Sequence, residues 1–232
     1  MRTLSALLLS GAVLASPVMA DQHVSPATIT VTGEGVVTAA PDLATVSLGV
    51  TTQGATAAEA MAANSASLAA VLERVKAAGV EDRDIQTSTL NLNPNWSNSD
   101  GSSMPEIQGY VATNTLSIRV RDMAKLGPIL DAAIADGANT LNGVSFGLAE
   151  PDPAMDEARK AAVAEARARA ELLTGAAGVG LGRIVSISES GGYAPPMPMY
   201  RMEAAMADAP VPVAGGEVGV TAQVTITWEI AQ

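Results

Sequence analysis

Alternating apolar residues on both sides of a proline-containing turn constrain the fold of this chain more than any other feature. They recur at every second position around residues 40–42 and include Ile29, Val31, Val37, Val46, Leu48 and Val50. A period of two is typical of strands that bury one face. Because Ala40-Pro41-Asp42 separates the two runs, the pattern predicts a hairpin-like pair of strands over residues 29–52.

A capping box predicts where the first helix begins. Thr56 and Glu59 have the spacing at which hydroxyl and carboxylate satisfy free N–H groups at a helix start. Gly79 is placed to end this helix. Its inner apolar stripe recurs at steps of three and four residues: Met61, Leu68, Val71, Leu72 and Val75.

Two further helices are predicted. The first of them is capped by Asp122, ends at Gly137 and has an apolar face formed by Leu126, Ile129, Leu130 and Ile134. Asp152 followed by Pro153 predicts the N-cap and first residue of a helix that continues to about residue 177. The alanines of this helix permit close approach to a neighbour: Ala158, Ala161, Ala162, Ala166 and Ala170. That neighbour is either the chain's own sheet, which we favour, or another subunit.

Strands and helices alternate along the rest of the chain. Further strands are predicted over residues 85–92, 110–121, 141–148, 183–188 and 217–230. In the second of these, Ser117, Arg119 and Arg121 face away from the apolar side of the strand. In the last, every second residue from Val218 to Ile230 shares one face. Strand, helix and strand recur over residues 43–93 and again over 110–149, which is a weak internal duplication. This order predicts an α+β fold in which an antiparallel or mixed sheet is covered by two or three amphipathic helices.

The first twenty residues have the features of a secretory signal peptide. Arg2 is followed by an apolar stretch over residues 4–14, and Val18 and Ala20 occupy the −3 and −1 positions of a cleavage site. Cleavage would leave residues 21–27 as a mobile N-terminus and 28–232 as the folded domain. No later segment reaches the ~18 apolar residues of a spanning helix, so we expect no transmembrane segment in the mature chain.

Composition excludes several classes of protein. The formal charge of −11 repels phosphate backbones, so we expect no nucleic-acid binding. The chain has no cysteine and its only histidine is His23, which excludes thiol chemistry and histidine-dependent triads. No pair of carboxylates lies in an apolar context suited to acid–base catalysis. The sequence therefore predicts no enzyme and no cofactor.

Two glycine-rich segments could be mistaken for nucleotide-binding loops. Gly33-Glu34-Gly35 lies within a predicted strand, and residues 178–182 lack the Lys-Ser/Thr pair of a phosphate loop. We expect these glycines to form bulges, bends or caps.

A metal site is a sharper hypothesis. Cleavage after Ala20 would expose Asp21-Gln22-His23, whose amine, amides and imidazole form a square-planar nitrogen set for Cu(II) or Ni(II). Four methionines that lie close together in the sequence supply thioethers, which prefer Cu(I): Met197, Met199, Met202 and Met206. These methionines also suit a flexible apolar contact surface or the reversible uptake of oxidant as sulfoxide.

Two long loops are predicted, over residues 93–108 and 191–216. Both exceed the ~12–15 residues usual for a structureless connection, so they are either disordered or used for binding. The second loop is rich in proline and alanine and also suits an arm that reaches another subunit.

Four segments carry a recognisable set of motifs: the G-x-G-x-V and P-D-x-A elements within residues 29–52, NSASLAAVLERVKAAGVEDRDIQTSTLNLNP, GYVATNTLSIRVRDMAKLGPILDAAIADGANTLNGVSF and DEARKAAVAEARARAELL. Together they resemble the SIMPL-domain family of Gram-negative envelope proteins. The family includes oxidative-stress-defence proteins and periplasmic immunogenic antigens. The resemblance implies a periplasmic or outer-membrane-associated protein that has no established catalytic site and is linked to stress resistance. Some members of the family assemble into large hollow oligomers.

These observations lead to two functional hypotheses. The first is a non-catalytic periplasmic protein that forms a homo-oligomer and contributes to oxidative- or envelope-stress defence. The alternative is a periplasmic copper- or small-ligand-binding protein.

Overall fold

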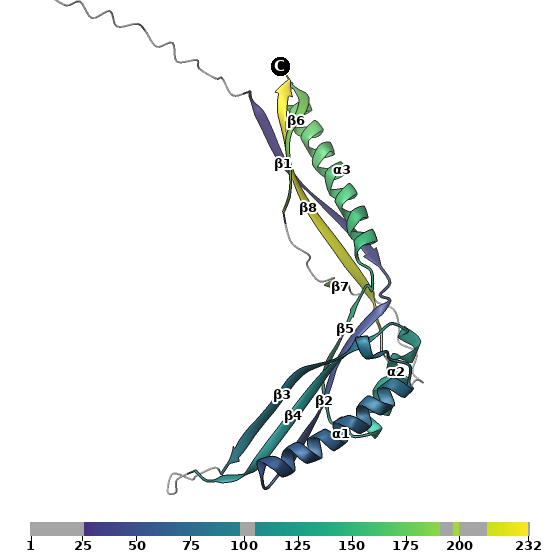
Figure 1. The fold of residues 1–232 in the computed structure, drawn as a ribbon. Coiled ribbons are helices and arrows are strands. Elements are labelled where there is room, and N and C mark those ends of the chain that lie inside the picture. The colour runs from purple at the N-terminus through teal and green to yellow at the C-terminus, as the bar shows by residue number, and fades with distance from the viewer. Residues whose placement is uncertain (1–25, 98–104, 191–196, 200–212, 232) are drawn as a thin grey trace, which may run out of the picture.

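The fold consists of two lobes placed end to end (Figure 1). The computed structural model describes residues 26–97, 105–190, 197–199 and 213–231. These residues form three α-helices and eight strands, and the strands make up two antiparallel sheets. The predicted α+β fold is confirmed, with the strands divided between two sheets rather than gathered in one.

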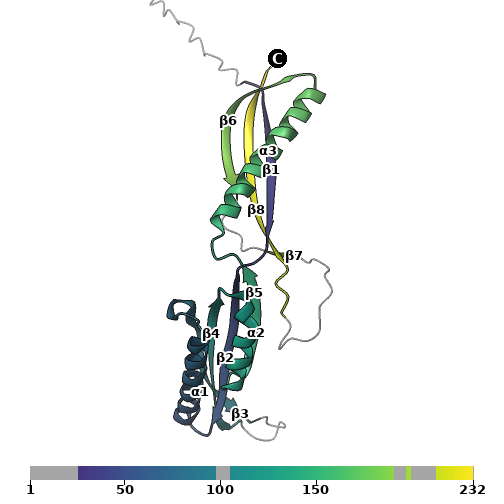
Figure 2. The same ribbon diagram turned by 90° about the vertical axis from the view of Figure 1, so that its right-hand side faces the viewer.

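The α3 lobe contains both ends of the described chain. Its sheet has the order β1-β8-β6, with β7 also paired to β8. The elements are β1 (Thr28–Ala39), α3 (Asp152–Ala176), β6 (Gly180–Ser190), β7 (Met197–Met199) and β8 (Glu217–Ala231). Figure 2 shows β6, β8 and β1 side by side, with α3 crossing them. The alternation predicted for the last strand is confirmed, because Val218, Val220, Ala222, Val224, Ile226 and Trp228 are all buried.

The α1/α2 lobe contains the middle of the chain. Its elements are β2 (Leu43–Gly54), α1 (Ala57–Ala77), the short 3-10 turn η1 (Asp82–Asp84), β3 (Ile85–Trp96), β4 (Ile107–Val120), the turn η2 (Met123–Lys125), α2 (Leu126–Ala135) and β5 (Thr140–Gly147). The sheet order is β3-β4-β2-β5. The units β2-α1-β3 and β4-α2-β5 are therefore interleaved, which is the split β-α-β arrangement of ferredoxin-like folds. It accounts for the strand–helix–strand duplication seen in the sequence.

The predicted hairpin over residues 29–52 is wrong. β1 pairs with β8, whereas β2 pairs with β4 and β5, so the two strands belong to different lobes. Residues 40–42 carry the chain across the junction. There the Asp42 amide donates to the Gly147 carbonyl at 3.2 Å, and the Asp42 carboxylate accepts a hydrogen bond from the Ala149 amide at 2.7 Å. These contacts hold Asp42 against the connection from β5 to α3.

Large aliphatic side chains form the core of the α1/α2 lobe. The capping box is confirmed: the Thr56 hydroxyl accepts from the Glu59 amide at 3.2 Å, and the Glu59 carboxylate accepts from the Thr56 amide at 3.1 Å. Of the α1 stripe, Leu68, Val71 and Val75 are buried, while Met61 and Leu72 are half-buried. The buried face of α2 includes Ala133 rather than Ile134, which is 53% exposed.

In the α3 lobe, alanine packs directly on glycine. A Cβ added to Gly33 would lie 2.1 Å from the carbonyl oxygen of Ala162, and one added to Gly35 would lie 2.0 Å from that of Ala158. Both glycines keep regular pairing with β8, so the expectation of a bulge, bend or cap is wrong at these positions. They allow the helix backbone to approach the strand. Packing of the Ala-rich helix on its own sheet, the interpretation we favoured, is confirmed.

The other glycine segment behaves as expected. Gly178 has a φ of 72° and follows the end of α3, where its amide donates to the Gly175 carbonyl. Gly182 lies within a register shift of β6 between Leu181 and Ile184.

Several boundaries differ from the expectations. Asp122 caps the turn η2, where it accepts from the Ala124 amide at 3.1 Å, and the N-cap of α2 is Lys125. Asp152 is the first residue of α3 rather than its cap, and the N-cap is Pro151, without a side-chain hydrogen bond. The loop predicted over residues 93–108 is shorter, because β3 continues to Trp96 and β4 begins at Ile107; residues 98–104 lie outside the described part. The loop over 191–216 contains β7, and its residues 191–196 and 200–212 also lie outside that part.

Candidate functional site

The outer strand of the α3 lobe carries apolar side chains that the helix does not cover. β6 pairs with β8 and with no other strand among the described residues. The buried cluster beneath α3 is built from the helix, β1 and β8, and β6 contributes only the half-buried Leu181 at its margin. Ile184, Val185 and Ile187 are 50%, 50% and 58% exposed. An unpaired strand edge with exposed apolar side chains is a template for association with another chain.

A groove runs between α3 and β6. It has a volume of about 380 Å³, and its walls include Val163 and Arg167 from the helix and Ile184 from the strand, with Trp228 beneath. The Arg167 guanidinium pairs with Glu171 at 2.8 Å. The groove therefore combines apolar side chains with the Arg167–Glu171 ion pair at its edge.

A second exposed strand lies in the α1/α2 lobe. β3 pairs only with β4 among the described residues, and Leu90, Leu92 and Trp96 are 55%, 39% and 54% exposed. Leu92 pairs with Ala112, which is buried beneath the helices. Leu92 therefore lies on the face of the sheet that the helices cover, but at a position that they leave exposed. Each lobe thus has an edge strand with several exposed apolar side chains. We call β3 and β6 the exposed edge strands.

The edge at β1 is protected in a different way. The Glu34 amide donates to the carboxylate of Glu165 on α3, and the Arg169 guanidinium donates to the Thr32 carbonyl at 2.8 Å. Charged side chains that bond to backbone groups on an edge discourage strand addition there. This contrast identifies β6 rather than β1 as the accessible edge of the α3 lobe.

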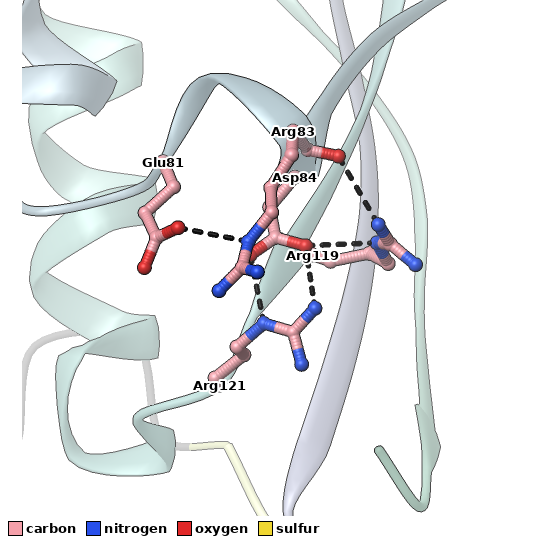
Figure 3. Close-up of polar contacts among 5 residues, drawn as sticks. All are labelled: Glu81, Arg83, Asp84, Arg119 and Arg121. Carbon is pink, nitrogen blue, oxygen red and sulfur yellow. Dashed lines mark hydrogen bonds and ion pairs between the residues drawn. The ribbon is translucent and has the colours of Figure 1, made fainter. Parts of the chain in front are cut away.

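A buried carboxylate organises a cluster of charges at the end of the α1/α2 lobe (Figure 3). Asp84, at the end of η1, is 4% exposed. Its carboxylate accepts hydrogen bonds from Arg121 Nε at 2.8 Å and Arg121 Nη2 at 2.9 Å, and Arg119 Nε lies 3.0 Å from Oδ1. We call Asp84, Arg119 and Arg121 the Asp84 cluster.

The surroundings of the Asp84 cluster are also charged. Arg119 Nη2 donates to the Arg83 carbonyl at 3.1 Å, and Arg83 Nε lies 2.8 Å from Glu81 Oε2. Val120 pairs with Ala44 near the start of β2, so this end of the sheet is the end nearest the junction between the lobes.

The Asp84 cluster has a defined electrostatic state. Hydrogen bonding from Arg121 lowers the pKa of Asp84 below its ordinary value, because it favours the ionised carboxylate more than burial opposes it. The hydrogen bond to Asp84 likewise raises the pKa of Arg121. Both groups are therefore charged at neutral pH.

Sequence reasoning placed Arg119 on the polar side of its strand but did not identify the cluster. Arg119 and Arg121 are alternate residues of a strand and its end, and such a pattern is also typical of a solvated face. Nothing around Asp84 in the sequence marks it as buried. Its burial results from η1 folding against β4, two segments that are separated along the chain.

The predicted metal ligands are mostly outside the described residues. This applies to Asp21, Gln22, His23, Met202 and Met206. The backbone of Met197 and Met199 forms β7, opposite Gly219 and Glu217 of β8. The part of the chain that the structure describes contains no group of three or more His, Cys, Asp or Glu side chains arranged for a metal ion. No helix among the described residues is long and apolar enough to cross a membrane.

Comparison with known proteins gives consistent results. The model of the family SIMPL, described as a protein of unknown function (DUF541), matches residues 29–228. The chain is 41% identical to the 26 kDa periplasmic immunogenic protein of Brucella melitensis, over 97% of this chain and 94% of the relative. It is 33% identical to the uncharacterized protein YggE of Escherichia coli K12, over 75% of this chain and 70% of that protein. YggE of Edwardsiella ictaluri is 31% identical, over 87% and 84% of the two chains.

Proposed function

Because the chain belongs to the SIMPL family, we propose that it is a non-catalytic periplasmic protein that acts by assembling into a homo-oligomer. The observation that carries this proposal is the pair of exposed edge strands. β3 and β6 each present a strand edge and apolar side chains, and burial of these groups against another copy stabilises association. The assembled protein contributes to oxidative- or envelope-stress defence and associates peripherally with the outer membrane.

The periplasmic location is supported by two observations. The relative from Brucella melitensis, 41% identical, is named as periplasmic. Residues 1–20 have the pattern of a cleaved signal peptide, and residues 28–232 then form the mature domain. Fractionation of cells followed by mass spectrometry of the purified protein tests both points. A periplasmic protein whose first residue is Asp21 supports the proposal, whereas a cytoplasmic protein that begins at Met1 contradicts it.

Light scattering tests assembly directly. We expect the mature protein, residues 21–232, to have a mass several times that of one chain, and the mass to fall when Ile187→Glu or Leu90→Glu places a charge on an exposed edge strand. Leu172→Glu is the matched control, because Leu172 is 71% exposed on α3 and its charge would not lie on a strand edge. A mature protein that remains monomeric at all concentrations overturns the proposed assembly.

The role in stress defence requires a test in cells. A strain that lacks the gene should survive peroxide less well, and the wild-type protein should restore survival. If assembly is the active property, Leu172→Glu should also restore survival, and Ile187→Glu should not. Equal rescue by both variants, at equal protein levels, would separate stress defence from assembly at β6.

Copper binding is the alternative function that the sequence supports. After cleavage, the only histidine of the chain would occupy the third position, in the square-planar set of Asp21, Gln22 and His23. Titration of the mature protein with Cu(II) should then give one bound ion per chain, and His23→Ala should remove it. Unchanged Cu(II) affinity in His23→Ala excludes this site, and Met→Leu replacements at Met197, Met199, Met202 and Met206 test Cu(I) binding separately.

A further inference from the structure

A small polar cavity adjoins the Asp84 cluster. It has a volume of about 120 Å³, and its lining includes Gly79, Asp84, Arg119, Arg121 and Lys125. Since one water occupies about 30 Å³ of liquid, the cavity has room for a group of a few heavy atoms. It is separate from the exposed edge strands on which the proposed assembly depends.

Three basic side chains of the α1/α2 lobe line this cavity: Arg119, Arg121 and Lys125. Residues 43–147 contain six Lys and Arg residues, and all of them lie at the end of α1, in η1, at or just beyond the end of β4 or in η2: Arg74, Lys76, Arg83, Arg119, Arg121 and Lys125. This gathering is unexpected in a chain of net charge −11. Long-range attraction of anions is therefore weak, and any recognition of an anion depends on these local cations.

The charges that face the cavity do not cancel. Arg119 and Arg121 share the single carboxylate of Asp84, which leaves one positive charge uncompensated. Lys125 Nζ has Asp122 as its ion-pair partner, but at 3.9 Å this is too long for a hydrogen bond. The remaining carboxylate of the lining, Glu81, is paired with Arg83. Three cations thus face two carboxylates that are available to them.

Hydrogen-bond donors remain available on the same groups. The Arg83 carbonyl accepts a hydrogen bond from Nη2 of Arg119, whose Nε forms an ion pair with Asp84. Asp84 accepts hydrogen bonds from Nε and Nη2 of Arg121. Within the described residues, Nη1 of both guanidinium groups has no hydrogen-bond partner. The two side chains are 46% and 43% exposed, so these donors are accessible from solvent.

We propose that this cavity binds a phosphate group, with Arg119, Arg121 and Lys125 as its direct ligands and Asp84 as a positioning residue. The planar fork of arginine matches phosphate oxygens, and charge-assisted hydrogen bonds to phosphate are strong. Asp84 holds the two guanidinium groups in place before the ligand arrives, which reduces the entropy lost on binding. A purely structural ion-pair cluster would attach η1 to β4 equally well, but it would not require Lys125.

NMR titration of the full mature protein with inorganic phosphate, at constant ionic strength, tests the site. We expect saturable shifts confined to residues 78–81 and 119–125. Lys125→Ala and Arg119→Gln should each weaken binding about tenfold, as expected for loss of one charge-assisted contact. Arg167→Gln is the matched control, because Arg167 is also an exposed, ion-paired arginine but lies in the α3 lobe, and this variant should bind as wild type does.

Two sources of phosphate are distinguished by parallel titrations. Glycerol 3-phosphate represents a soluble phosphate ester, and vesicles that contain phosphatidic acid represent a lipid headgroup. Binding of either probe that Lys125→Ala and Arg119→Gln weaken, and Arg167→Gln does not, supports the proposal and identifies the source. No saturable binding of any probe, or equal binding by Lys125→Ala and the wild type, overturns it. Light scattering of Lys125→Ala in parallel keeps a failure of this site separate from a failure of assembly.

Discussion

The two lobes achieve close packing by opposite means. In the α1/α2 lobe, Leu68, Leu116 and Ile118 fill the space between helices and sheet with aliphatic volume. In the α3 lobe, Ala158 and Ala162 bring the helix backbone against Gly33 and Gly35, so little volume needs to be filled. The comparison shows that one chain can pack one lobe with large side chains and the other by close approach of helix and strand backbones. Truncation should therefore damage the first lobe, and enlargement should damage the second.

The difference also affects the surfaces that remain exposed. The buried cluster beneath α3 is formed with β1 and β8, while β6 is left with exposed apolar residues. In the α1/α2 lobe, two helices cover the inner strands and leave β3 exposed. Both lobes therefore have an exposed edge strand in spite of their different cores. The edge strands, rather than either core, carry the proposed assembly.

Enlargement at the glycine contact should have the largest effect on stability. Gly35→Val places its Cβ 2.0 Å from the Ala158 carbonyl, a backbone atom that can move only with the helix. We expect a loss of about 4 kcal/mol in the free energy of unfolding, above the usual cost of overpacking because backbone rather than a side chain is displaced. Fluorescence of Trp228, which is buried beneath α3, would report the displacement in a Trp96→Phe background.

Gly175→Ala is the control for this prediction. Gly175 lies near the end of α3, has no positive φ, and a Cβ there would meet nothing within 4 Å. Alanine should stabilise the helix by roughly 0.5–1 kcal/mol. Equal tolerance of the Gly35→Val and Gly175→Ala changes would contradict packing by proximity.

Truncation in the α1/α2 lobe should have the next largest effect. Leu116 is 1% exposed in the middle of β4, and Leu116→Ala should cost about 3 kcal/mol through lost apolar contacts and the cavity left behind. Urea unfolding followed by circular dichroism measures the loss. Leu172→Ala, at an exposed site on α3, should change stability by less than about 0.5 kcal/mol. A small loss in Leu116→Ala would indicate that this core can collapse around the gap.

Acid should destabilise the α1/α2 lobe through Asp84. Its pKa in the folded protein lies below the ordinary 3.8, so its contribution to stability is fully present above about pH 5 and is lost as the pH falls below 3.8 through the lower folded value. Asp84→Asn should lower stability at pH 7 by less than Leu116→Ala does. Its stability should also fall less steeply than that of the wild type between about pH 5 and pH 2.5, measured by urea unfolding. If the free energy of unfolding falls equally with pH in the two proteins, Asp84 does not contribute to acid destabilisation.

The helix caps should give the smallest difference between the lobes. Thr56→Ala removes a capping box from α1 and should cost about 1 kcal/mol. Asp152→Ala in α3 removes no cap hydrogen bond and should cost only the interaction of its charge with the helix dipole, roughly 0.3–1 kcal/mol at most. Thermal unfolding of the two variants compares them. A larger loss of stability in Asp152→Ala than in Thr56→Ala would contradict the predicted difference between the two helix caps.

Local sequence patterns predicted most of the secondary structure. Alternation identified which residues of β8 are buried, the capping box placed the start of α1, and the recurrence of strand, helix and strand corresponds to the interleaved units of the α1/α2 lobe. The main error concerns which strands pair with each other, not where the strands and helices lie in the sequence. Proximity along the chain suggested that β1 and β2 pair with each other, but the partner of β1 is β8, whose paired residues lie close to the opposite end of the chain.

By itself, the sequence determined the α+β class, the positions of most helices and strands, the inward face of β8, the lack of cysteine and the single histidine. These properties depend on the spacing of side chains within a few turns or strand residues, or on composition alone. Only the tertiary structure decided that the strands form two sheets, that Gly33 and Gly35 allow α3 to approach β1, and that Asp84 is buried between two arginines. Each of these features depends on contacts between segments far apart in the chain, which no local period encodes.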